Sequence, residues 1–329
     1  MALLEIKNLH LAFGKTSVLD GISLSLEPKE VLCIVGESGS GKSVTALSIA
    51  RLLASPPAHY SAGEILLEGR DTLRMTKREL RQIRGGVVSY IFQDPGSSLN
   101  PVFRVGAQIM ETLRLHRPQV ATRDEVLRLL KLVRISAPEQ RVDAYPHQLS
   151  GGMQQRVMIA MAIACHPKLL IADEPTTALD VTIQAQILEL LRDFRDRLGM
   201  SILLITHNLG IVSQVADRIA VMYAGQIVET GAISQVLSEP RHPYTQALMQ
   251  SVPSLGANVE RLRAIPGLVP RPGAFPNGCR FHPRCFKVRP DCASIPPELL
   301  SLEEARAVRC RYWNCPPPTA EGPEGTLRK

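Results

Sequence analysis

The feature that most constrains the fold of this chain is the glycine-rich segment "GESGSGKS", residues 36–43. It fits the pattern G-x-x-x-x-G-K-[ST], follows the apolar run "VLCIVG" and precedes "KSVTALSIARLL", which has the pattern of a helix. A loop in that position points successive backbone N–H groups inward at a helix N-terminus and forms an anion site. Lys42 is then placed for the β- and γ-phosphates of a nucleotide and Ser43 for Mg²⁺. An ordinary glycine-rich turn is disfavoured because both flanking elements and the full pattern are present.

Alternating and continuous apolar runs predict the strands around this loop. Residues 3–13 and 17–27 alternate around a turn-like "GKT" and predict antiparallel strands, and 63–71 predict another strand and turn. The runs "HPKLLIADEP" and "MSILLITHN" predict two further buried strands. A hairpin is expected to turn at Ala224 and Gly225. The sequence therefore predicts an α/β fold.

Residues 104–165 have mostly helical patterning. In "TRDEVLRLLKLVRI", Thr122 is placed to cap a helix with Glu125 three residues later. From about residue 236 prolines become dense and helical periodicity fades, so we place a domain boundary there. The last segment, "CPPPTAEGPEGTLRK", is expected to form a disordered end.

Two carboxylates end the strand in "LLIADEP". The carboxyl edge of an open α/β sheet is where ligands bind. We expect Asp173 to hold Mg²⁺, through water, and Glu174 to polarise the attacking water as general base. Taken alone, the pair is also compatible with a salt bridge or a helix cap, but the phosphate loop upstream favours catalysis.

A second anion site is predicted in "LSGGMQQR", residues 149–156. Ser150 caps the start of an apolar helix, and two glycines leave its first N–H groups open at the positive end of the helix dipole.

These motifs together resemble those of the nucleotide-binding subunits of ABC transporters. "GESGSGKS" resembles Walker A, "LLIADE" resembles Walker B, and "LSGGMQQR" resembles the signature that separates this family from other P-loop ATPases. The resemblance implies a P-loop ABC ATPase over residues 1–235, with a RecA-like core, an antiparallel β subdomain and a helical subdomain at about 95–165. It also implies a small Cys-rich C-terminal domain over residues 236–329.

The same resemblance implies roles for residues outside the three motifs. Gln93 in "YIFQDP" matches the Q-loop, Asp180 in "ALD" matches the D-loop, and His207 in "LLITHN" matches the switch histidine. Phe13 stands where the family stacks an aromatic ring on adenine, with packing in the β subdomain as the alternative. The implied catalytic residues are Lys42, Gln93, Glu174 and His207, and the implied Mg²⁺ ligands are Ser43, Gln93 and Asp173. The implied nucleotide-binding set is Phe13, Gly36, Glu37, Ser38, Gly39, Ser40, Gly41, Lys42, Ser43, Val44, Ser150, Gly151, Gly152 and Asp180.

The family arrangement implies partners. Two such subunits, identical or different, pack head to tail with ATP between the Walker A loop of one and the signature of the other. The longest apolar run, residues 157–165, is far shorter than the ~20 residues of a membrane-spanning helix. We therefore expect two separate membrane permease subunits, with the segment after Gln93 and the helical subdomain forming the groove for one of them.

Two segments narrow the family. "EPRHPYTQALMQSVP", residues 239–253, and "QDPGSSLNPVFRVG", residues 93–106, resemble the ATPases of oligopeptide, dipeptide and nickel importers. This implies an ATPase that powers uptake of di- and oligopeptides, with nickel or another small solute as the alternative, and an extracytoplasmic substrate-binding protein as a partner. A nucleic-acid-associated ABC ATPase is disfavoured because the chain has no coiled coil and no second cassette. The start of the chain does not resemble a signal peptide, so we expect a peripheral protein on the cytoplasmic face of the inner membrane.

Four cysteines near the end form the last pattern. They are separated by five, six and seventeen residues: Cys279, Cys285, Cys292 and Cys310. Disulfides are disfavoured in a reducing compartment, and the paired spacing common at zinc sites is absent. The "GCRFHPRC" tail resembles those of importer ATPases that hold a [4Fe–4S] cluster, which implies these four thiolates as its ligands, with zinc or spare thiols as alternatives.

The charge distribution favours an anionic centre in the same region. Residues 241–329 carry 13 Lys and Arg against 7 Asp and Glu, a net of +6, whereas residues 1–240 carry a net of +1. No acidic residue lies in 261–290, whose basic residues are Arg261, Arg263, Arg271, Arg280, Arg284, Lys287 and Arg289. We expect Arg280 and Arg284 to offset the cluster's charge. Cys33 and Cys165 are expected in the core, and Cys315 as a spare or alternate ligand.

Overall fold

The computed structural model describes residues 1–177, 179–251, 265–303 and 305–316. Its main sheet has the strand order β11-β12-β10-β9-β3-β8-β7-β6, and the five strands from β9 to β6 are parallel. The parallel strands are β3 (Val31–Val35), β6 (Val88–Ile91), β7 (Leu169–Asp173), β8 (Ser201–Thr206) and β9 (Arg218–Tyr223). The α/β fold and the buried strands expected from the apolar runs are confirmed.

The central strands bury both faces, which explains their continuous apolar sequences. In β3, Val31, Cys33 and Val35 face one core cluster, and Leu32 and Ile34 face the other. One cluster joins the sheet to the helices of the lobe described below, and the other joins it to α1 and the N-terminal sheet. Cys33 and Cys165 are both buried, as expected.

The N-terminal sheet is antiparallel, with strand order β2-β1-β4-β5. Its strands are β1 (Leu4–Phe13), β2 (Thr16–Leu26), β4 (Ala58–Leu67) and β5 (Arg70–Asp71). Helix α1 (Lys42–Ile49) lies between this sheet and the main sheet, with Ala46 and Ile49 buried in the shared core. The phosphate-binding loop therefore sits where the two sheets meet.

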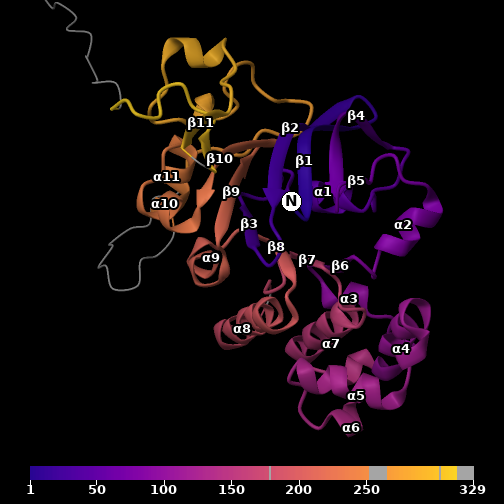
Figure 1. Ribbon diagram of the computed structural model, residues 1–329. Helices are drawn as coiled ribbons and strands as arrows, with labels where there is room; N and C mark the ends of the chain where they lie inside the picture. Colours follow the sequence, from indigo (N-terminus) through magenta and orange to yellow (C-terminus); the bar gives the residue numbers. More distant parts are fainter. Residues whose placement is uncertain (178, 252–264, 304, 317–329) are drawn as a thin grey trace, which may run out of the picture.

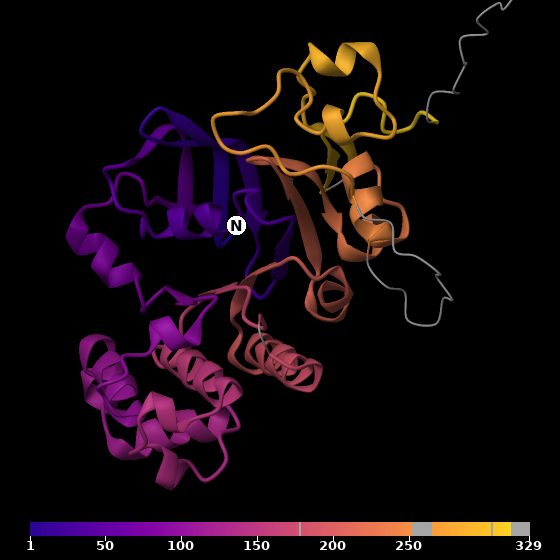
Figure 2. The ribbon, with the colours of Figure 1, turned by 180° about the vertical axis from the view of Figure 1, so that it is seen from behind.

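A helical lobe hangs below the sheets in Figures 1 and 2. It contains α3 (Pro95–Ser98), α4 (Val105–His116), α5 (Arg123–Leu132), α6 (Pro138–Arg141) and α7 (Gly151–Ile163). The Thr122 side chain accepts a hydrogen bond from the Glu125 N–H and begins α5, as the capping pattern predicts. Outside the lobe lie α2 (Lys77–Ile83), α8 (Val181–Leu198) and α9 (Leu209–Val215).

The C-terminal region lies at the end of the molecule opposite the helical lobe (Figures 1 and 2). Strand β10 (Gln226–Ala232) pairs with β9 through the predicted Ala224–Gly225 turn, and β12 (Arg306–Val308) pairs with β10. Strand β11 (Leu300–Glu303) then closes the edge of the same sheet. The region is thus continuous with the main sheet, and a separate Cys-rich domain and the boundary at residue 236 stay predictions.

The first part of this region is helical although its sequence has little helical periodicity. Helices α10 (Ile233–Ser238) and α11 (Pro243–Gln250) form there, followed by the short 3₁₀ turns η3 (His282–Arg284) and η4 (Pro290–Ala293). Burial of Val236 and Tyr244 stabilises α10 and α11 in place of a long apolar periodicity. The expected disordered end falls almost wholly on residues 317–329, which lie outside the described residues.

Within the described ranges, no helix has the length and apolar character needed to cross a bilayer.

Candidate nucleotide-binding site

The phosphate-binding loop joins β3 to α1 and depends on glycines at two points. A Cβ on Gly36 would lie 2.1 Å from the carbonyl oxygen of Met222, so only glycine fits there. Gly41, which precedes α1, has a φ of 104° and also has little room for a side chain. The loop is therefore folded tightly against β9 and β2, with its N–H groups at the start of α1.

Lys42 crosses this loop. Its side chain is buried, and Nζ donates hydrogen bonds to the carbonyl oxygens of Gly36 at 2.8 Å and Glu37 at 3.1 Å. An ammonium group has three N–H donors, so one remains for a phosphate oxygen. Burial lowers the pKa of Lys42, while the carboxylates of Glu174, Asp173 and Glu37 oppose that shift. These carboxylates therefore favour the charged form of Lys42, next to the place where a phosphate would bind.

Asp173 ends β7 beside Ser43. Its Oδ1 atom is buried and has no hydrogen-bond partner among the described residues. A buried oxygen of this kind is suited to binding a cation or another ligand. Burial raises the pKa of Asp173, and the nearby Glu174 raises it further, while Ser43 and Lys42 lower it. A divalent cation between Ser43 and Asp173 would satisfy this orphaned oxygen, so the two residues fit the Mg²⁺ expected from sequence.

Three side chains converge on Glu174. Its Oε2 accepts hydrogen bonds from Gln93 Nε2 at 3.1 Å and Thr177 Oγ1 at 2.9 Å, and its Oε1 lies 3.3 Å from His207 Nδ1. Its backbone has a φ of 48°, a left-handed conformation that is strained for glutamate and is held by a hydrogen bond from its N–H to Ile205. The structure therefore brings together Gln93, Glu174 and His207, three of the residues that the resemblance implies to be catalytic, and their catalytic roles stay predictions.

Thr177 is a member of this group that the sequence reasoning missed. Its signal is a hydroxyl three residues after the strand-end glutamate.

The signature segment lies elsewhere in the chain. Ser150 caps α7 by accepting a hydrogen bond from the Met153 N–H at 3.4 Å. Helix α7 belongs to the helical lobe, whereas α1 lies between the sheets (Figures 1 and 2). A single chain thus keeps its two predicted anion sites apart, and the roles of Ser150, Gly151 and Gly152 toward ATP stay predictions.

Two further predicted residues have local structural partners. Asp180 caps α8 by accepting a hydrogen bond from the Ile183 N–H at 2.9 Å, and the preceding Ala178 lies outside the described residues. Phe13 is half-buried at the end of β1 and packs against the core shared by the two sheets. Packing thus accounts for its position, and its stacking on adenine stays a prediction.

The two arginines inside "GCRFHPRC" point toward the ATPase core and not into the cysteine turns. Arg284 forms a bidentate ion pair with Glu37, and Arg280 contacts Asp20 and the carbonyl of Ala224. The expectation that these two offset a cluster's charge is therefore wrong. The basic groups that interact electrostatically with these thiols are instead Lys287, near Cys310, and Arg309, near Cys279. Arg261 and Arg263 lie outside the described residues.

The four cysteines near the end come from separate turns but lie close together. Burial, together with the neighbouring thiols of Cys279, Cys310 and Cys292, raises the pKa of Cys285 to about 12. Burial raises the pKa of Cys310 to about 11, with added contributions from Cys279 and Cys292. In the chain as described, however, no group of three or more His, Cys, Asp or Glu side chains has the arrangement of a metal site.

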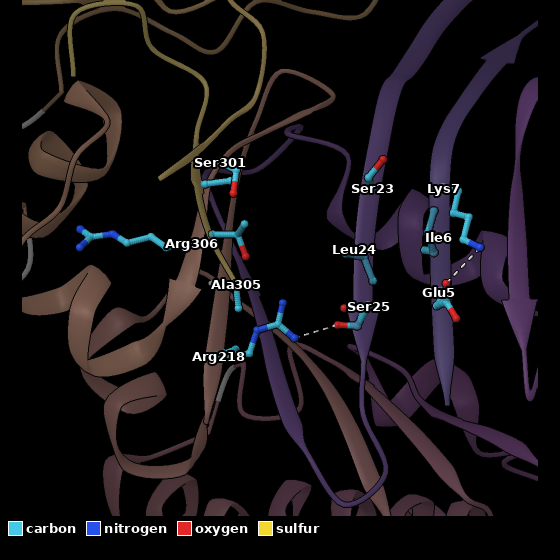
Figure 3. A pocket seen from close by; sticks show the side chains of 12 residues that line it. Glu5, Ile6, Lys7, Ser23, Leu24, Ser25, Arg218, Ser301, Ala305 and Arg306 are labelled. Carbon is cyan, nitrogen blue, oxygen red and sulfur yellow. Dashed lines mark hydrogen bonds and ion pairs between the residues drawn. The ribbon is translucent and has the colours of Figure 1, made fainter. Parts of the chain in front are cut away.

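A shallow groove separates the N-terminal sheet from the β12 hairpin. Figure 3 shows Ser23 and Ser25 on one wall, Ser301 and Ala305 on the other, and the Arg218 guanidinium reaching the Ser25 carbonyl. Among the described residues, none predicted for the nucleotide site lines this groove. The groove is therefore distinct from the phosphate-binding loop.

The fold and the site define a P-loop ATPase of the ATP-binding cassette class. Residues 19–177 match the family described as ABC transporter, and residues 228–292 match the family described as oligopeptide/dipeptide transporter, C-terminal region. The chain therefore belongs to the ATP-binding proteins of ABC transporters, in the branch that carries the oligopeptide/dipeptide C-terminal region.

Individual relatives agree with this assignment. The dipeptide transport ATP-binding protein DppD of Haemophilus influenzae is 52% identical over 316 residues, covering 94% of this chain and 95% of that protein. DppD of Escherichia coli is 49% identical over 318 residues, covering 95% and 97%. A dimeric ATP-binding cassette, solved in a post-hydrolysis state with ADP and phosphate, matches with a TM-score of 0.62 and 27% identity over 70% of this chain and 98% of that one.

Proposed function

We propose that this chain is the ATP-hydrolysing subunit of an ABC importer that takes up di- and oligopeptides. The observation that carries the proposal is the match of residues 228–292 to the oligopeptide/dipeptide transporter C-terminal region, in a chain whose upstream residues form an ATP-binding cassette. The names of the two DppD relatives support peptides as the imported solute.

The site residues act by position and charge. The loop N–H groups and the free donor of Lys42 bind the phosphates. Glu174 is the base that accepts a proton from the attacking water, while Gln93 and His207 hold its carboxylate in place. Mg²⁺, held by Ser43 and Asp173 with Gln93, would neutralise charge on the phosphate oxygens.

Partners complete this site. A second ATPase subunit, identical or different, would bring its signature segment to the phosphate loop of this chain, because one chain keeps the two anion sites apart. Exposed apolar side chains just after Gln93 support a permease contact: Val102 is 71% exposed and Phe103 is 54% exposed. Two permease subunits and an extracytoplasmic binding protein would place this chain on the cytoplasmic face of the inner membrane.

Transport assays with purified components test the peptide assignment. The chain is reconstituted in proteoliposomes with its permeases, second ATPase and binding protein, and uptake of labelled di- and tripeptides is measured with ATP. We expect ATP-dependent peptide uptake that is lost with Glu174→Gln. Nickel uptake without peptide uptake would contradict the proposal while leaving the ATPase assignment intact.

We also propose that Cys279, Cys285, Cys292 and Cys310 hold a [4Fe–4S] cluster, with zinc as the alternative. Four mutually close thiols support this, as does a hydrogen bond from the Lys287 N–H to the Cys285 sulfur at 3.4 Å. When bound, such a cluster would tie four turns of the chain together and supply a one-electron centre.

Metal analysis of anaerobically purified protein tests the cluster. We expect about four irons and four acid-labile sulfides per chain. Cys285→Ser should lose them and Cys315→Ser should keep them. Stoichiometric zinc without iron would reject the cluster.

A further inference from the structure

The C-terminal region touches the phosphate-binding loop through a buried arginine. The Arg284 side chain is only 5% exposed, and its Nη1 and Nη2 donate to Glu37 Oε2 at 2.8 Å and Oε1 at 3.0 Å. Such a fork-to-fork pair fixes the orientation of both partners. Glu37 is the second residue of the loop, so this contact acts directly on the loop's conformation.

The same glutamate is held at its backbone. The Glu37 N–H donates to the Tyr244 hydroxyl at 2.9 Å, and Tyr244 is fully buried in α11. Tyr244, Tyr223 and Phe281 form an aromatic cluster, with ring centroids 4.6 to 5.4 Å apart, that places this hydroxyl. The Glu37 carbonyl in turn accepts from Lys42 Nζ. A continuous chain of contacts therefore runs from Arg284 through Glu37 to the phosphate-binding lysine.

A second contact reaches the loop near its other end. Arg280 donates to the carbonyl of Ala224, and the next residue, Gly225, donates its N–H to the Ser40 carbonyl at 2.8 Å. Both arginines of "GCRFHPRC" are therefore linked to the phosphate-binding loop. Arg284 contacts it directly, and Arg280 is linked to it through the Ala224–Gly225 turn.

A buried ion pair by itself contributes little net stability, because removing two charges from water offsets most of their attraction. Its consequence lies in geometry. Without Arg284, the Glu37 carboxylate would lose its bidentate partner, and the loop would gain conformations in which Lys42 and the loop N–H groups do not converge.

We propose that Arg284, together with Tyr244, positions the phosphate-binding loop, so that the C-terminal region sets the nucleotide affinity of its own chain. The inference rests on ATP binding at this loop, as in the proposed function.

Nucleotide titration of the full chain tests the positioning role. Arg284→Gln should weaken ATP and ADP binding about five- to twentyfold, a typical size for coupling between linked sites. Arg284→Lys keeps the charge but not the fork, so its affinity should fall between those of the wild type and Arg284→Gln. The control is Arg271→Gln, an exposed arginine of the same region, which should bind ATP as the wild type does.

A charge exchange separates positioning from general loss of folding. The double variant Glu37→Arg with Arg284→Glu should recover at least half of the affinity lost by Arg284→Gln, because the fork can form in the opposite sense. In ATPase assays with the partner subunits, Arg284→Gln should raise KM for ATP more than it lowers kcat. A matched fall in kcat with unchanged KM would overturn the inference.

Hydrogen exchange of the wild-type chain tests the link without any substitution. Adding ADP should slow amide exchange in residues 37–43 and also in 279–285, because linkage is reciprocal. In Arg284→Gln the second effect should disappear. Protection of 37–43 alone in the wild type, or equal ATP affinity of Arg284→Gln and wild type, would overturn the inference. A wild-type chain that binds no ATP would instead overturn the proposed function.

Discussion

The phosphate-binding loop and the cysteine turns differ in how their chemical groups are held. In the loop, Lys42 already spans two carbonyl oxygens, and Glu174 is fixed by three neighbouring side chains. Cys292 lies in η4 and Cys285 directly follows η3, whereas Cys279 and Cys310 lie outside the helices and strands. The four thiols are near one another without forming a ligand arrangement. Groups at the ends of buried strands are held by the rigid sheet, whereas groups on turns are held less precisely by the protein alone.

The difference also concerns distance along the chain. The catalytic groups lie next to the strands that place them, so protein contacts alone fix their geometry. The cysteines span residues 279–310, where Phe281 and Val308 are the buried hydrophobic side chains of the described core. The nucleotide site is therefore formed before its ligand binds, whereas the four cysteines are expected to reach their final arrangement when a ligand binds.

The largest effect is expected from Glu174→Gln. Removing the general base should lower kcat about 10²- to 10⁴-fold, while ATP affinity stays within about threefold of the wild type. Turnover and nucleotide binding are measured with the partner subunits present. The matched control is Glu189→Gln, an exposed glutamate paired with Arg134, which should keep full turnover. Normal hydrolysis by Glu174→Gln would show that the strand-end carboxylate does not carry the chemistry.

The second prediction tests whether the cysteine turns fold without metal. In chelated and reduced protein at pH 8, Cys285 should react with iodoacetamide about thirty- to a hundredfold more slowly than cysteine in a short unstructured peptide. Burial raises the pKa of Cys285 from 9.0 to about 12, which removes thiolate a thousandfold, and the higher nucleophilicity of a more basic thiolate offsets part of that loss.

The sign of the pH dependence follows from the raised pKa. Below it the thiol stays protonated, so the alkylation rate should rise about tenfold per pH unit from pH 7 to 10. Peptide mapping by mass spectrometry gives the rate for each cysteine, and 8 M urea provides the unfolded reference. A native rate equal to the rate in urea would mean that the turns form only around a bound centre, which would widen the contrast with the phosphate loop.

The same contrast explains what the sequence could predict. Lys42, Ser43, Asp173 and Glu174 were identified because each lies within a strand and loop whose pattern is local. Tyr244 and Arg284 lie 207 and 247 residues from Glu37, and nothing in the sequence links them to the loop. Helix α11 and strand β12 escaped prediction for the same reason, since packing and pairing on the main sheet stabilise them. The orientation of Arg280 and Arg284 was predicted wrongly because a charge count shows which residues are basic and not where they point.

The smallest effect is expected from Thr177, which holds the base by one hydrogen bond. Thr177→Val removes the donor to Glu174 Oε2 and should lower kcat about three- to tenfold with KM for ATP unchanged. The loss is limited because Gln93 still donates to the same oxygen. Thr177→Ser keeps the hydroxyl and should retain the wild-type rate. Thr177→Val could leave kcat unchanged while Arg284→Gln weakens ATP binding. The ion pair between Arg284 and Glu37 would then affect ATPase activity more than the hydrogen bond between Thr177 and Glu174.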